Sequence, residues 1–146
     1  MKRASTSMMI GLILLSLCGS AGRINAAEKP APPDAPRIAL KGLDPIEFIA
    51  GKAVQGNKKI SSDYRKFKYT FANEKNKALF GKDPARYAIQ GDGSCPVAPK
   101  FQVDPDLVMV YKGKIYGFAT VACMGMFGKD PEKYLAKWPG NPDKKK

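Results

Sequence analysis

The sequence contains no histidine among its 146 residues, so it lacks the side chain that most often serves as a general base near neutral pH. No serine or cysteine has a recognisable activating partner either. Asp44, Asp83 and Asp130 are each followed by proline, and capping of a helix accounts for all three. These absences favour a non-catalytic protein.

Long apolar runs are also missing. The longest, Met8–Cys18, follows two basic residues and is much shorter than the roughly 20 residues that span a bilayer. Small residues follow at positions 19–22, and Ile24-Asn25-Ala26 then forms a site compatible with cleavage of a signal peptide after Ala26. The sequence therefore predicts a protein exported to the periplasm or outside the cell and not spanning the membrane. Lipid anchoring at Cys18 is a less favoured alternative, because the preceding Leu17 is large.

The charge is strongly one-sided, with 25 basic and 13 acidic residues and a net charge of +12. Residues 1–26 contain three basic residues and no acid, so their removal leaves 22 basic and 13 acidic residues. The lysines are spread along the chain without a compact stripe, which does not favour nucleic acid as a partner. An anionic surface or protein of the cell envelope suits this charge, and so does simple solvation of a lysine-rich face.

A segment of 24 residues occurs twice in the chain. Tyr64–Tyr87 aligns without a gap on Tyr111–Tyr134, 47 positions later, with ten identities, where chance gives only one or two. Such a fixed offset is typical of a duplicated supersecondary unit. Only the second copy contains sulfur, in Cys123, Met124 and Met126, and Cys95 lies just upstream of it.

Each copy has the pattern of a hairpin followed by helices. In the first copy, Phe67, Tyr69 and Phe71 alternate with polar residues, which predicts a strand with one aromatic face. In the second copy, Lys112–Gly113 predicts a tight hairpin. Cap residues and Asp-Pro steps predict a helix and a further helical turn in both copies; the predicted caps are Asn73, Asp83, Thr120 and Asp130. The two small units are expected to share one core, in an α+β fold.

Upstream of the first copy, Ile38–Lys41 resembles a short strand and a short helix is predicted to run to Ala50. Asp44 is its predicted cap, with Glu47 as the reciprocal arm of a capping box. The domain organisation predicted is a signal peptide, a proline-rich linker, two units and a basic tail, at residues 1–26, 27–37, 38–94, 95–140 and 141–146.

Several motifs resemble the exported YHS-domain proteins. Residues 87–95 resemble the Y-A-P-Q-Y-G-G-Y-C element of that family, and residues 39–45 resemble its A-x-K-G-Y-D-P-V opening. Residues 69–76 resemble its Y-x-F-x-S-x-E-N step from strand to helix. The resemblance covers about Arg37–Trp138 and implies two YHS-like units.

The second copy is also similar to shorter metal-associated relatives, found beside copper-transporting ATPases, with the pattern D-P-V-C-G-M and then Y-x-F-C-S-x-x-C. Residues 116–123 keep the final cysteine of that pattern as Cys123, while Ala119 stands in place of the first. Cys95 precedes a Pro-Val pair instead of following one. The resemblance implies that Cys95 and Cys123 approach each other at the family's metal site.

Two uses of this cysteine pair remain open. An even pair in an oxidising compartment favours a disulfide, within a structural or interaction module that binds no metal. Thiolate and thioether groups instead favour Cu(I), with Cys95 and Cys123 as ligands, Met126 as a weaker candidate and Met124 weaker still. Zinc is disfavoured because its structural sites need four ligands, and haem ranks below copper because no attachment motif is present.

Overall fold

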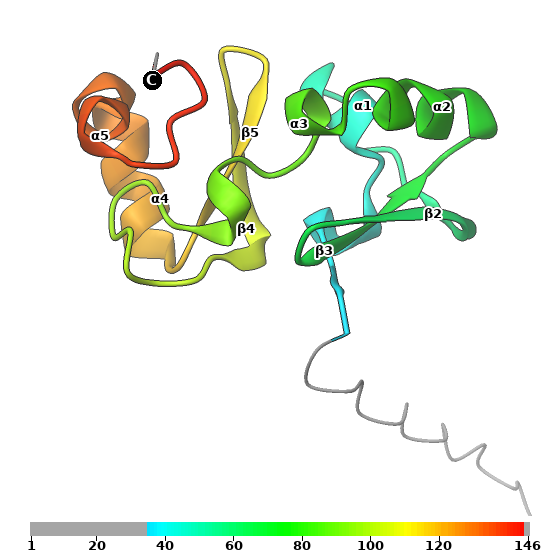
Figure 1. Ribbon diagram of the computed structural model, residues 1–146, viewed down its shortest axis with the longest axis horizontal. Helices are drawn as coiled ribbons and strands as arrows, with labels where there is room; N and C mark the ends of the chain where they lie inside the picture. The colour runs from blue at the N-terminus through cyan, green and yellow to red at the C-terminus, as the bar shows by residue number, and fades with distance from the viewer. Residues whose placement is uncertain (1–34, 145–146) are drawn as a thin grey trace, which may run out of the picture. The chain divides into compact units, whose positions relative to one another are not determined.

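The computed structural model describes residues 35–144 (Figure 1). The predicted signal peptide, most of the linker and the last two residues of the tail lie outside this range. The strands are β1 (Arg37–Ile38), β2 (Asn57–Tyr64), β3 (Phe67–Phe71), β4 (Asp104–Tyr111) and β5 (Lys114–Phe118). The helices are α1 (Pro45–Ile49), α2 (Glu74–Lys82), α3 (Pro84–Tyr87), α4 (Val121–Lys129) and α5 (Pro131–Lys137), with single 3-10 turns η1 (Leu40–Gly42) and η2 (Gly91–Gly93). The predicted α+β fold is confirmed.

Strand β3 lies in the middle of a three-stranded sheet. It pairs with β2 in the antiparallel first hairpin and with β1 in parallel. The alternation in β3 buries Phe67, Tyr69 and Phe71, as predicted. Asn73 caps α2, and Phe80 from this helix packs on the rings of Tyr69 and Phe71 at centroid distances of 4.9 and 5.2 Å. The aromatic face of the strand therefore finds its cover in the next helix.

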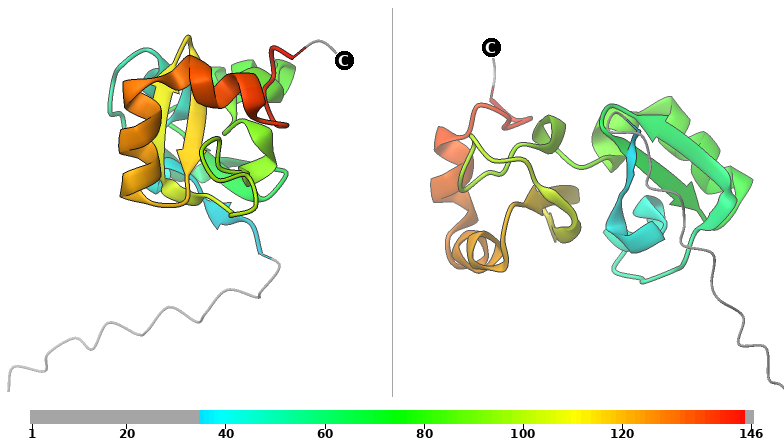
Figure 2. Two further views of the ribbon diagram at one scale, coloured as in Figure 1. Left: turned by 90° about the vertical axis from the view of Figure 1, so that its left-hand side faces the viewer. Right: turned by 90° about the horizontal axis from the view of Figure 1, so that it is seen from below.

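The second hairpin, β4–β5, repeats this arrangement 47 positions later. Its turn lies at Lys112 and Gly113, both with positive φ, as the sequence predicted. Thr120 caps α4, and Phe127 packs on Tyr116 and Phe118 at 5.3 and 5.1 Å. Helix α4 covers one side of the β4–β5 hairpin and continues into α5 (Figure 2).

The repetition begins further upstream than the sequence identities indicate, with a different offset. Turns η1 and η2 have the same left-handed backbone, with φ of 53° and 79° at Lys41 and Gly42 and of 55° and 80° at Asp92 and Gly93. Residues 37–43 thus correspond to residues 88–94, which pair with β5 through the parallel bridge of Ile89 to Ile115. The predicted boundary between Ser94 and Cys95 had assigned residues 88–94 to the first unit. We call residues 37–87 the first repeat and residues 88–138 the second repeat.

A reciprocal exchange of side chains supports this correspondence. In the first repeat, the position where Gly56 would carry a Cβ lies 2.4 Å from Oγ1 of Thr70. In the second repeat the roles are exchanged, because Val103 fills the space beside Gly117, where a Cβ would lie 2.9 Å from the valine. Each repeat therefore has room for one side chain at this contact.

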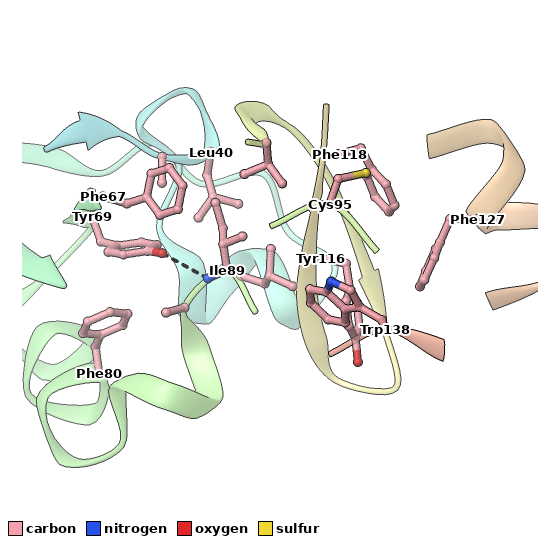
Figure 3. Close-up of a cluster of buried hydrophobic side chains, with 14 of the residues drawn as sticks. Leu40, Phe67, Tyr69, Phe80, Ile89, Cys95, Tyr116, Phe118, Phe127 and Trp138 are labelled. Carbon is pink, nitrogen blue, oxygen red and sulfur yellow. Dashed lines mark hydrogen bonds between the residues drawn. The ribbon is translucent and has the colours of Figure 1, made fainter. Parts of the chain in front are cut away.

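The buried side chains of both repeats form one cluster, as predicted. At its centre the Tyr69 hydroxyl accepts a hydrogen bond of 3.0 Å from the backbone N–H of Ile89 (Figure 3). Burial raises the pKa of Tyr69, so the hydroxyl stays protonated. Among residues 35–144, no helix is long and apolar enough to cross a membrane.

Asp44 is fully buried and caps α1, but its carboxylate does more than the sequence predicted. One oxygen accepts from the backbone N–H of Ile46, and the other accepts from Ala72 N at 2.7 Å and from Nδ2 of Asn76 at 2.8 Å. The predicted capping box is wrong, because the N–H of Asp44 donates to Val54 O and the Glu47 carboxylate accepts from Asn76. A single carboxylate thus joins α1, the end of β3 and α2.

Replacing Asp44 with alanine should lower the free energy of unfolding by about 3 kcal/mol, because it leaves buried donors without an acceptor. Asp83→Ala removes an exposed cap and should cost about 1 kcal/mol. Urea denaturation of both variants measures the difference. Equal losses would contradict a central role for Asp44.

Candidate metal centre

The two cysteines lie at different depths in the second repeat. Cys95 follows η2 and is fully buried, with its sulfur in the core near the Phe118 ring (Figure 3). Cys123 is the third residue of α4, is half-buried, and donates its N–H to the Thr120 hydroxyl that caps the helix. Both thiols are free, so the disulfide that the sequence left open is not formed in this structure.

Cys95 occupies the position that Asp44 has in the first repeat. Each follows one of the two matching turns, and the N–H of each donates across the loop that follows, from Asp44 to Val54 O at 2.9 Å and from Cys95 to Phe101 O at 3.2 Å. The loop is four residues shorter in the second repeat and contains no counterpart of α1. This deletion changes the offset between the repeats from 51 to 47 positions.

Cys123 occupies the position of Asn76. Both are the third residue of their helix, and both donate their N–H to the side chain of the cap residue. In the first repeat the side chains at these two positions meet directly, since Asn76 Nδ2 lies 2.8 Å from Asp44 Oδ2. The same pair of backbone positions carries the two thiols in the second repeat.

The two methionines follow Cys123 in α4 and project from different faces of the helix. Met124 is half-buried and packs against the core, whereas Met126 is 45% exposed. Met126 therefore does not belong to the core. Because Met126 is three positions from Cys123, the two share one side of the helix. In the part of the chain that the structure describes, no group of three or more histidine, cysteine or acidic residues could hold a metal ion.

The aromatic residues beneath α4 offer no anionic ligand near neutral pH. The Tyr116 ring packs between Phe127 and Trp138. Burial, followed by the carboxylates of Asp143 and Glu132, raises the pKa of Tyr116 to about 12. Thiolates and thioethers are therefore the soft donors that this region provides.

A pocket of about 450 Å³ opens elsewhere, between the segments around residues 64–65, 85–94 and 139–142. The ion pair of Arg65 and Asp92 lies among its lining residues, which include neither cysteine nor methionine. The sequence contained no signal for this pocket.

Comparison with known protein families finds one domain in this chain. Residues 98–138 match the YHS domain. The match covers β4, β5, α4 and α5, and thus Cys123, Met124 and Met126, while Cys95 lies three residues before it. No curated protein and no solved structure matches the chain.

The YHS match leaves the first repeat unassigned, and sequence reasoning missed how this repeat relates to the cysteines. The only signal in the sequence was a glycine two positions before Asp44 and another two positions before Cys95, at Gly42 and Gly93. Without the backbone, the change of offset between them hid the correspondence.

Exposure predicts the order in which the thiols react. In the metal-free Cys18→Ser variant without reductant, an alkylating agent should modify Cys123 first and Cys95 only after denaturation in urea. Mass spectrometry of the native and denatured protein measures both steps. An unmodified chain about two mass units light would show a disulfide instead and contradict the free thiols.

Proposed function

We propose that this protein is an exported, non-catalytic YHS-domain protein that binds Cu(I) through Cys95 and Cys123. We further infer that the first repeat is a YHS-like unit whose corresponding residues, Asp44 and Asn76, form a structural hydrogen bond in place of a metal site. The observation that carries the proposal is the placement of two thiols at positions whose side chains meet in the other repeat.

The spacing of these positions supports a shared metal ion. A cysteine sulfur takes the place of the carbon that bears the polar atoms in Asp44 and Asn76. Given the 2.8 Å hydrogen bond, those carbons lie roughly 4 Å apart. Two thiolates on one metal, at about 2.3 Å each, lie up to about 4.6 Å apart, whereas a disulfide requires about 2.05 Å.

The donor set favours Cu(I) over other metals. Two thiolates with a nearby thioether are soft ligands, and Cu(I) is the soft ion that such ligands select. Cys95 and Cys123 would hold the ion, and Met126 is the available third donor, with Met124 the weaker candidate. Zinc would need two further ligands of a kind that the site does not offer.

The alternative function is a disulfide-stabilised structural or interaction module of the cell envelope. It is supported by the even number of cysteines expected after export and by the basic charge. A disulfide between Cys95 and Cys123 would stabilise the folded state by roughly 3 kcal/mol, in the description in which the closed loop lowers the entropy of the unfolded chain. It would also prevent both thiols from binding metal.

A Cu(I) titration tests the proposal, with Cys18→Ser as the background so that only two thiols remain. The background protein should bind one Cu(I), and Cys95→Ser or Cys123→Ser should weaken binding by more than the 10–100-fold typical of losing an outer-shell partner. Met126→Leu should have a smaller effect and Met124→Leu a smaller one still, and Met109→Leu in β4 serves as the control. Unchanged binding by Cys123→Ser would exclude the proposed site.

A further inference from the structure

We propose that the exposed face of α4 is a docking surface for an acidic protein that exchanges Cu(I) with Cys123. The inference rests on the proposed function and adds its partner. The face consists of Val121, Ala122, Gly125, Met126 and Lys129, all of which are exposed. Val121 and Met126 are 65% and 45% exposed, so this face presents apolar surface to solvent.

The first repeat shows that the fold does not require an apolar surface here. Helix α2 has the same length, cap and packing, but Glu74 and Lys75 stand where α4 has Val121 and Ala122. Lys77 likewise stands in place of Met124. Three charged residues of one helix are therefore apolar in the other at matching positions. Packing against the core accounts for Met124, but the positions of Val121 and Ala122 are exposed in both helices, so packing against the hairpins does not explain their change.

Gly125 adds a second sign of an external contact. A glycine within a helix costs about 1 kcal/mol relative to alanine. Its φ is not positive, and a Cβ at this position would meet nothing within 4 Å, so neither backbone nor packing requires glycine here. With Ala122 beside it, the residue lets another chain approach the helix closely.

The face also borders the half-buried thiol. Cys123 and Met126 are one helical turn apart, so Met126 is the residue of the exposed face that lies next to the cysteine. Because Cys95 is fully buried, a donor from another protein reaches the pair at Cys123. In the exchange, a bond from Cu(I) to the donor's sulfur breaks as one to Cys123 forms, the thiol proton passes to solvent, and no electron is transferred.

Charge selects the kind of partner. Lys129, Lys133 and Lys137 extend from α4 along α5, are exposed, and form no ion pair within residues 35–144. Glu132 is held by Lys112, which lowers the pKa of its carboxyl group, and the Asp130 carboxylate caps α5. A second copy of the chain, with a net charge of +12, would be repelled, whereas an acidic surface would be attracted.

The test transplants the α2 surface onto α4. V121E/A122K reproduces Glu74 and Lys75 without changing the net charge, and E74V/K75A is the matched control on the opposite helix. The probe is a synthetic acidic peptide with two cysteines, loaded with Cu(I), and the transfer rate is followed by stopped flow. V121E/A122K should slow transfer by about tenfold or more, and E74V/K75A should not.

Two further measurements distinguish failure of the docking surface, of the acidic partner and of the proposed function. Uptake from a Cu(I)–acetonitrile complex should be equal in the unmodified protein and V121E/A122K, and a peptide with glutamines in place of its acids should deliver Cu(I) more slowly. If the acidic peptide delivers Cu(I) at the same rate to the unmodified protein and to V121E/A122K, the docking surface is wrong. If the acidic peptide and the glutamine peptide deliver Cu(I) to the unmodified protein at the same rate, the acidic partner is wrong. No uptake from acetonitrile by the unmodified protein would instead overturn the proposed function itself.

Discussion

The buried carboxylate of Asp44 determines how the first repeat is assembled. A fully buried charge is costly unless every acceptor site is used, and Asp44 uses its oxygens on the start of α1, on Ala72 after β3 and on Asn76 in α2. Residues 44–47 are far in the sequence from residues 72–76, and the carboxylate fixes these two segments to one point. The hairpin supplies the aromatic face and the helix covers it, but their junction depends on this network.

The second repeat keeps the junction and changes its chemistry. Cys95 and Cys123 take the two positions that Asp44 and Asn76 hold, and the shorter loop removes the helix that Asp44 caps. The sulfur of Cys95 is buried without charge pairing, so the repeat relies more on packing. Trp138 contributes by lying against Gly91, where a Cβ would come within 1.9 Å of the indole ring. One repeat can therefore retain the structural hydrogen bond while the other carries reactive thiols.

Much of this fold could be predicted because its signals are local. Alternating aromatics in β3, the caps Asn73 and Thr120 and the hairpin at Lys112–Gly113 depend on neighbouring residues and were correct. The role of Glu47 was wrong, because Asp44 N–H pairs with Val54 across the loop. The exposure of Met126 and the match of Cys95 to Asp44 were also missed. Both depend on which positions of the assembled repeat face the core, and the altered offset conceals this in the sequence.

The most direct test of the central claim, that the cysteine pair and the Asp44–Asn76 pair occupy equivalent positions, is a substitution of one pair by the other. C95D/C123N, in the Cys18→Ser background, should be more stable than C95D alone, because Ala119 N and the new asparagine can donate to one oxygen of the new carboxylate as Ala72 N and Asn76 do in the first repeat. It should bind no Cu(I). A double variant no more stable than C95D, whose buried charge lacks the asparagine donor, would contradict the equivalence, and retained Cu(I) binding would contradict the metal site.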